Sequence, residues 1–220
     1  MINKIFSILQ KEIKIELSQG HLFFSVLLYI VSSTYVIYLS FQPSGLFDME
    51  TWVSIFWILI LYGSITSVSK SFFQESSKRN FYYYYVYSAD ELILSKLIYN
   101  FLFLICISSF TFIIFSFLLG DIIISKFFFL SLLILGSLSI SNCLTLISAI
   151  SYQVENNSLI ISILGFPVIL PILLILIRIS KISSIDFSWN LIRDDIYLLI
   201  LLNVILLSLT KVLFSYLWRN

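Results

Sequence analysis

Six apolar runs, each long enough to cross a lipid bilayer, constrain this chain more than any motif in it. Crossing about 30 Å of hydrocarbon takes about 20 residues of α-helix, and in lipid the helix satisfies its own backbone hydrogen bonds. The runs occupy residues 22–41, 52–69, 97–119, 127–151, 159–178 and 196–217. Pro167 and Pro171 predict a kink in the fifth run. The pattern predicts an all-α integral membrane protein with six transmembrane helices in a single domain, residues 1–220.

Charge is too scarce in this chain for a water-soluble fold. Only 11% of its 220 residues are charged and 60% are hydrophobic, whereas a soluble domain is about 25% charged. The net charge of +1 gives no sign of nucleic-acid binding. Cys106 and Cys143 lie in apolar runs without a CxxC motif, which indicates buried, inert thiols and no metal site. His21, the one histidine, is interpreted as an interfacial residue rather than a haem ligand.

Lysine and arginine counts predict the orientation. With the N-terminus inside, the inside segments hold nine such residues: Lys4, Lys11, Lys14, Lys70, Lys78, Arg79, Lys96, Lys211 and Arg219. The outside loops hold four: Lys126, Arg178, Lys181 and Arg193. The positive-inside rule therefore predicts that both termini are cytoplasmic. Tyr38, Trp52 and Trp57 are predicted to anchor the outer interface, and Trp218 the inner one.

Residues 1–20 predict a different element, an amphipathic helix lying in the plane of the inner interface. Its apolar residues recur at helical spacing: Ile2, Ile5, Phe6, Leu9, Ile13 and Leu17. Lys4, Lys11 and Lys14 fall mostly on the other side, where they would face anionic headgroups. Because charges run through this stretch, we do not expect a cleaved signal peptide.

Residues 70–96 form the longest polar interruption and are the candidate docking segment for a soluble partner. Ser88 followed by Glu91 predicts a capping box that opens the third span. A short helix before it would carry the candidate contact residues Phe72, Phe73, Gln74, Glu75, Lys78 and Arg79. An ordinary interfacial loop is the alternative that composition leaves open.

Polar residues inside the spans predict packing rather than chemistry. Ser137, Ser141 and Thr145 are spaced four apart, and small or hydroxyl residues let membrane helices approach closely. Asn142 and Asn203 are each predicted to form a hydrogen bond to a neighbouring helix. We expect no ionisable residue deep in a span, and the chain has no G-x-x-x-x-G-K-[ST] loop for phosphate. It is therefore expected to be neither an ATPase nor another enzyme on its own.

The whole chain resembles the CcmB family, haem exporter protein B, the ABC-2-type permease subunit of the cytochrome c biogenesis ABC transporter. The resemblance rests on four stretches: KEIKIEL at 11–17, SKSFFQESSKRNFYYYYVYSADELILSKLIYN at 69–100, LGSLSISNCLTLISAISYQVENNSLIISILGFPVILPILLILI at 135–177 and YLWRN at 216–220. One departure concerns the coupling loop, where many members carry an acidic-Gly pair followed by a short acidic helix. This chain has Glu75-Ser-Ser-Lys-Arg-Asn and then tyrosines.

The resemblance implies the ABC-2-type exporter permease fold in a bacterial inner membrane. It implies a non-catalytic subunit that pairs with a separate CcmA-like ATP-binding subunit and works beside a CcmC-like haem-handling protein and a CcmE-like haem chaperone. ATP would be bound by the partner and haem handled by the complex, with no cofactor held by this chain. The implied role is to couple ATP hydrolysis to haem delivery or to release of the haem-loaded chaperone. A homodimer or hetero-oligomer is expected.

Two alternatives stay open at this point. A generic ABC-2 permease exporting a lipid, a drug or a polysaccharide would have the same fold, and a membrane scaffold without transport would have the same composition. Co-purification with an ATPase subunit separates both permeases from the scaffold. Loss of c-type cytochromes on deletion separates the CcmB-like role from the generic permease.

Overall fold

The described part of the chain is helical throughout. A computed structural model describes residues 2–19, 21–41, 48–73, 87–120, 122–151, 157–185 and 189–217, which form seven helices and no strand. The helices are α1 (Ile2–Gln19), α2 (His21–Phe41), α3 (Met49–Phe73), α5 (Ala89–Leu119), α6 (Lys126–Ser151), α7 (Asn157–Ile185) and α8 (Trp189–Leu217). The all-α prediction is confirmed.

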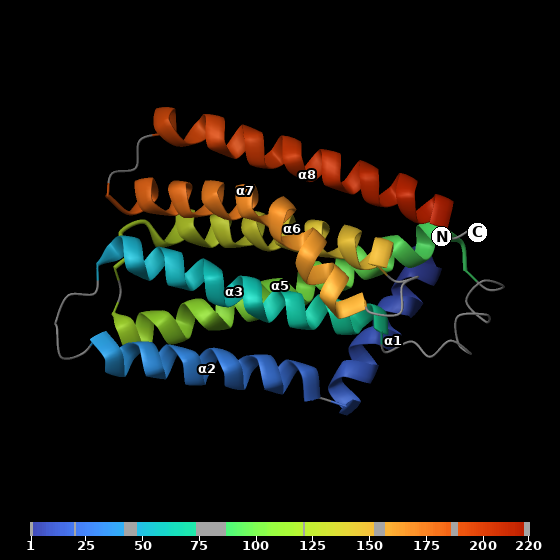
Figure 1. The fold of residues 1–220 in the computed structure, drawn as a ribbon, viewed down its shortest axis with the longest axis horizontal. Helices are drawn as coiled ribbons and strands as arrows, with labels where there is room; N and C mark the ends of the chain where they lie inside the picture. The colour runs from blue at the N-terminus through green and yellow to red at the C-terminus, as the bar shows by residue number, and fades with distance from the viewer. Residues whose placement is uncertain are drawn as a thin grey trace.

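Six of these described helices, α2 to α8, are long and apolar enough to cross a membrane, which confirms the predicted number of spans. Four helices, α3, α5, α7 and α8, exceed their predicted bounds by three residues or more. α5 begins at Ala89 rather than at residue 97, so the last part of the predicted loop is helical. α7 continues through Pro167 and Pro171 to Ile185. It bends about midway along its length (Figure 1), as two prolines that cannot donate backbone hydrogen bonds would cause.

Successive long helices run in opposite directions, so the bundle has two distinct ends (Figure 1). At one end lie the starts of α2, α5 and α7 and the final turns of α3, α6 and α8. α1 lies at this same end, steeply inclined to the other helices, and both chain ends are marked there. We call it the α1 end, and the other the opposite end.

α6 is the central helix of the bundle. It packs against α3, α5, α7 and α8, and every residue from Ser139 to Ala149 is buried. By contrast, α2 and α8 present long exposed apolar faces with residues such as Leu28 and Val212. Exposed apolar side chains on spanning helices are suited to contact with lipid.

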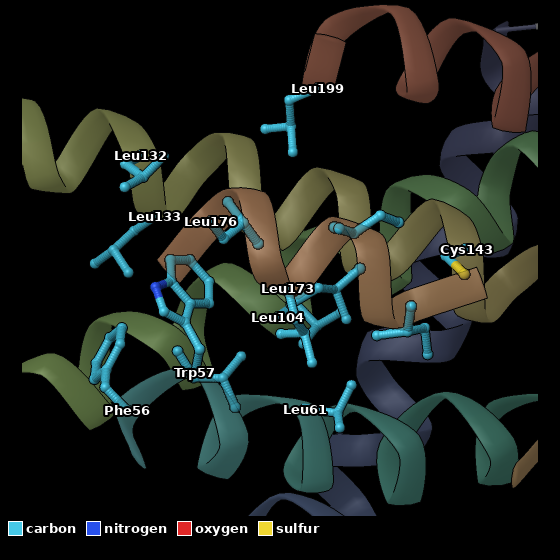
Figure 2. Packing of buried hydrophobic residues seen from close by; sticks show 14 of the residues in the cluster. Phe56, Trp57, Leu61, Leu104, Leu132, Leu133, Cys143, Leu173, Leu176 and Leu199 are labelled. Carbon is cyan, nitrogen blue, oxygen red and sulfur yellow. The ribbon is translucent and has the colours of Figure 1, made fainter. Parts of the chain in front are cut away.

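An aromatic cluster fills the core between α3, α5 and α6. Trp52 stacks on Phe56 with ring centroids 5.3 Å apart, and Phe129 lies 5.4 Å from Phe56. Figure 2 shows Trp57 reaching from α3 toward Leu176 of α7. The prediction that Trp52 and Trp57 anchor the outer interface is wrong, because their exposed fractions are 1% and 0%. They face the neighbouring helices rather than the headgroups.

Gly136 of α6 explains how the Trp57 ring fits. A Cβ atom placed at this glycine would clash with the ring's Cη2 atom. The missing side chain therefore lets the indole lie directly on the α6 backbone, the use that membrane proteins make of small interface residues. The Trp57 Nε1–H donates a hydrogen bond to Ser180 Oγ of α7 at 3.0 Å, which ties three helices together.

Candidate functional site: the junction of α1 with the start of α5

The start of α5 is fixed by its own sequence. The Glu91 backbone N–H donates to Ser88 Oγ at 3.4 Å, and the Ser88 N–H donates to Glu91 Oε2 at 3.2 Å. These reciprocal bonds form the predicted capping box, which satisfies two of the backbone donors left free at a helix start. The segment 74–86 therefore ends at a firmly defined helix.

A buried ion pair joins α1 to α5 two turns further on. Lys96 Nζ lies 3.5 Å from Glu12 Oε1, and the two side chains are 1% and 10% exposed. Lys11 Nζ is 3.9 Å from the same oxygen, so the Glu12 carboxylate lies between two cations. Removing one partner of a buried pair leaves an uncompensated charge, which costs about 3–5 kcal/mol. The pair therefore makes the position of α1 depend strongly on that of α5.

Two further contacts hold the same turns of α5. Ser215 Oγ of α8 donates to Asp90 Oδ1 at 3.3 Å. A small apolar cluster joins α5 to α6 and α8; its buried members are Leu92, Ile93, Leu97, Ala149 and Phe214. The first turns of α5 are thus attached to α1, α6 and α8 together, so a displacement at residue 88 would be passed to three helices.

Beyond these turns, hydrogen bonds run along the interfaces of α6. Asn100 Nδ2 donates to Thr145 Oγ1 at 2.9 Å. Ser108 and Ser137 share a hydrogen bond of 3.0 Å between α5 and α6. The hydroxyl spacing predicted as packing therefore does pack against α5.

Asn142 and Asn203 bond to each other, which confirms the prediction that each bonds a neighbouring helix. Asn142 Nδ2 donates to Asn203 Oδ1 at 2.9 Å. Asn203 Nδ2 in turn donates to Ser139 Oγ at 2.6 Å. Two amides buried in an apolar bundle need such partners, because mutational data put the cost of an unpaired buried polar group at about 1–3 kcal/mol. These bonds fix α8 against α6.

The predicted contact residues of the coupling segment lie outside what the structure describes. Gln74, Glu75, Lys78 and Arg79 belong to the undescribed stretch 74–86. Phe72 and Phe73 lie in the last turn of α3, but their side chains are not described. Their role stays a prediction, and what the structure adds is the anchored helix start that follows them.

Glu12 and Lys96 were missed as a pair by sequence reasoning. Lys96 was assigned to an inside loop, and Glu12 was one charge among several in the N-terminal helix. The available signal was spacing: Ile8, Glu12 and Ile15 are four and three residues apart and share one helix face. A carboxylate on a partly apolar face predicts a buried cation opposite, but the partner helix cannot be read from the spacing.

The prediction of two buried thiols is half right. Cys143 is buried in the core, whereas Cys106 is exposed on α5. Within the described ranges no group of three His, Cys, Asp or Glu residues could hold a metal ion. The side chain of His21 lies outside the described set, so its interpretation stays a prediction.

These features together define a multi-pass membrane protein. Its buried side-chain hydrogen bonds lie at the interfaces between helices, and its buried Lys96–Glu12 ion pair lies at the α1 end. The family model described as CcmB protein matches residues 3–216, and the chain belongs to the CcmB family. Membership implies a membrane component of the haem exporter for cytochrome c biogenesis. No curated protein and no solved structure matches the chain.

Proposed function

We propose that this chain is the non-catalytic membrane subunit that receives the work of ATP hydrolysis from a separate, CcmA-like ATP-binding subunit. One observation carries the proposal: the segment 74–86 is followed by the capping box at Ser88, and the first turns of α5 are attached to α1, α6 and α8. A force applied by a partner at that segment would therefore move several spans together. If the start of α5 were not attached to its neighbours, the force would not be transmitted to them.

The α1 end is the cytoplasmic end in this proposal, and α1 lies in the inner interface of a bacterial inner membrane. Three faces of α1 support this placement. Ile8 and Glu12 are buried against the bundle, whereas Phe6 and Ile13 are exposed apolar residues. Lys14 is exposed on a third face. A helix of this kind directs its apolar face toward acyl chains and its lysines toward anionic headgroups.

The proposed complex couples ATP hydrolysis to haem delivery or to release of a haem-loaded, CcmE-like chaperone beside a CcmC-like protein. Family membership supports this setting. A homodimer or hetero-oligomer of this chain would present its coupling segments to the ATP-binding subunits. In this arrangement ATP stays in the partner and haem is handled by the complex, with no cofactor resident in this chain.

The test replaces the proposed contact residues in the intact complex. Glu75→Lys combined with Arg79→Glu, or Phe72→Ser combined with Phe73→Ser, should abolish pull-down of the ATP-binding subunit from membranes and c-type cytochrome maturation. Two positions are changed at once because a single exposed ion pair contributes only about 0–1 kcal/mol. The matched control swaps charges at the opposite end, Glu50→Lys with Lys181→Glu, and should leave both readouts intact.

Normal pull-down and maturation in both double variants, at normal protein levels, would refute the coupling role of residues 70–96. Residues 152–158, the other inside segment between spans, would then be the next candidate for the coupling element. Retention of c-type cytochromes in a deletion strain would instead refute the cytochrome c setting and favour a generic ABC-2 permease.

A further inference from the structure

A groove of about 420 Å³ opens at the α1 end between α1, α2 and α5. Ile13 and Glu16 line it from α1, Phe23 and Phe24 from α2, and Leu102 and Phe103 from α5. The rings of Phe23 and Phe103, which both line it, meet edge to face 5.8 Å apart. Phe24 and Leu102 are 68% and 46% exposed, so the groove is open toward the surroundings of the bundle.

The groove is polar at one end and apolar at the other. Glu16 and Tyr99 contribute its polar groups, and Tyr99 lies one turn into α5 from Lys96. Cys106, which also lines the groove, is two turns further along the same face, about 10 Å deeper at 1.5 Å per residue. α2 and α5 are both candidate spans, so this gradient runs from the membrane surface toward the hydrocarbon.

Glu16 is held in place as the groove's charged group. Its Oε1 atom accepts a hydrogen bond from the Phe23 backbone N–H at 2.9 Å, which fixes the carboxylate at the connection between α1 and α2. Among the described residues that line the groove no cation accompanies it. A carboxylate fixed beside aromatic walls is complementary to an ammonium group, and the rings also attract cations through their faces.

We propose that this groove binds an amine-headed phospholipid, with the ammonium at Glu16 and one acyl chain along α5 toward Cys106. Charge complementarity selects the headgroup, because a headgroup without an amine offers the carboxylate no cation. The order of polar and apolar groups selects an amphiphile over a wholly apolar ligand. This proposal is independent of the coupling role, because it uses none of residues 70–86.

The test uses the full chain in lipid nanodiscs and phospholipid probes with a photoactivatable diazirine in the acyl chain. A phosphatidylethanolamine probe should label the peptide that contains Leu102 and Cys106 at least fivefold more than a phosphatidylglycerol probe. Glu16→Gln keeps the oxygen that accepts from Phe23 but removes the charge, and should bring this ratio close to one. Leu102→Trp fills the groove and should reduce labelling there by both probes at least fivefold.

The matched control is Ile113→Trp, at an exposed position of α5 outside the groove, which should change neither the labelling nor the ratio. Circular dichroism and gel filtration of each variant exclude misfolding as the cause. Equal labelling of the groove by the two probes in the unchanged chain would overturn the proposal, as would a preference for phosphatidylglycerol. Absence of lipid labelling together with crosslinking of two chains through Cys106 would show that a second copy occupies the groove.

Discussion

Each end of the bundle has a Lys–Glu ion pair, but the pair at the α1 end is buried and the pair at the opposite end is exposed. At the α1 end, Lys96 and Glu12 are 3.5 Å apart and only 1% and 10% exposed. At the opposite end, Lys181 and Glu50 approach more closely, 2.9 Å, yet are 32% and 70% exposed. Solvent screens the second pair, whereas desolvation makes each charge of the first depend on its partner. Burial rather than distance therefore decides which pair constrains the fold.

The opposite end holds a second pair, Arg178 of α7 with Asp195 of α8 at 3.3 Å, in which the guanidinium is 68% exposed and the carboxylate only 15%. These two pairs join α7 to a neighbouring span, and neither involves α1. Of these three pairs, only Lys96–Glu12 has both side chains 10% exposed or less, and it lies at the α1 end, next to the proposed coupling segment. This asymmetry predicts that mutations of equal chemistry have unequal effects at the two ends.

The largest expected effect is all-or-none and assigns each end to a side of the membrane. In a background with Cys106→Ser and Cys143→Ala, an impermeant maleimide added outside should modify Ser44→Cys and leave Ser77→Cys unmodified. The reason is the excess of Lys and Arg in segments at the α1 end. Permeabilised membranes serve as the control, since both cysteines should then react. The reverse labelling pattern in intact cells would show that the protein has the opposite orientation.

Lys96→Met should be the most destabilising change among the ion pairs. It leaves the Glu12 carboxylate buried with Lys11 as a more distant cation, and we expect a loss of about 3–5 kcal/mol. Unfolding of the purified protein by increasing SDS in mixed micelles measures this free energy. Adding Glu12→Leu should return stability to at least the starting value, because removing both charges removes the penalty. A double variant as unstable as Lys96→Met would disprove that the pair acts as a unit.

Asn203→Leu should have an intermediate effect because it removes neutral hydrogen bonds to Asn142 and Ser139 and leaves no buried charge unpaired. Hydrogen bonds inside membrane bundles contribute about 0.6–1.7 kcal/mol, and the same SDS titration should show a loss in that range. Ser208→Ala, at an exposed position on the same helix, is the control and should be neutral. A neutral Asn203→Leu would mean that the amide pair contributes nothing to holding α8.

Lys181→Met should have the smallest effect, about 0–1 kcal/mol, since it breaks an exposed pair. The residual effect should shrink further as ionic strength is raised, whereas that of Lys96→Met should not, because buried pairs are screened little. Titrations at low and high salt measure both. A loss for Lys181→Met as large as that for Lys96→Met would remove the difference between the ends.

Sequence reasoning succeeded where the cause is local. The span number follows from apolar runs of the required length, and the capping box at Ser88 follows from a residue spacing of three. The Asn142 and Asn203 bonds were predictable in kind, because a buried amide needs a partner, although not that each is the other's partner. In each case the physical requirement lies within one helix.

Failures occurred where the outcome depends on which helix lies opposite. Trp52 has a sequence position typical of an interface anchor, but α5 and α6 bury it. Lys96 was predicted to be a charge of an inside loop, because the sequence does not show that α1 places Glu12 next to it. Cys106 was predicted to be buried, because hydropathy cannot distinguish contact with lipid from contact with protein. The groove residues come from three helices, so no single stretch predicts them. The candidate coupling residues remain a prediction from sequence.

The hydrogen bonds of α6 also imply an order of assembly as the chain enters the membrane. The bonds of Ser137 and Thr145 are to α5, the span synthesised immediately before, so this helical hairpin can satisfy them at once. Asn142 must wait for Asn203 in α8, which is synthesised two spans later. Until α8 is inserted, the Asn142 amide lacks this partner in the most buried helix, so insertion of α8 completes the hydrogen bonding of the bundle.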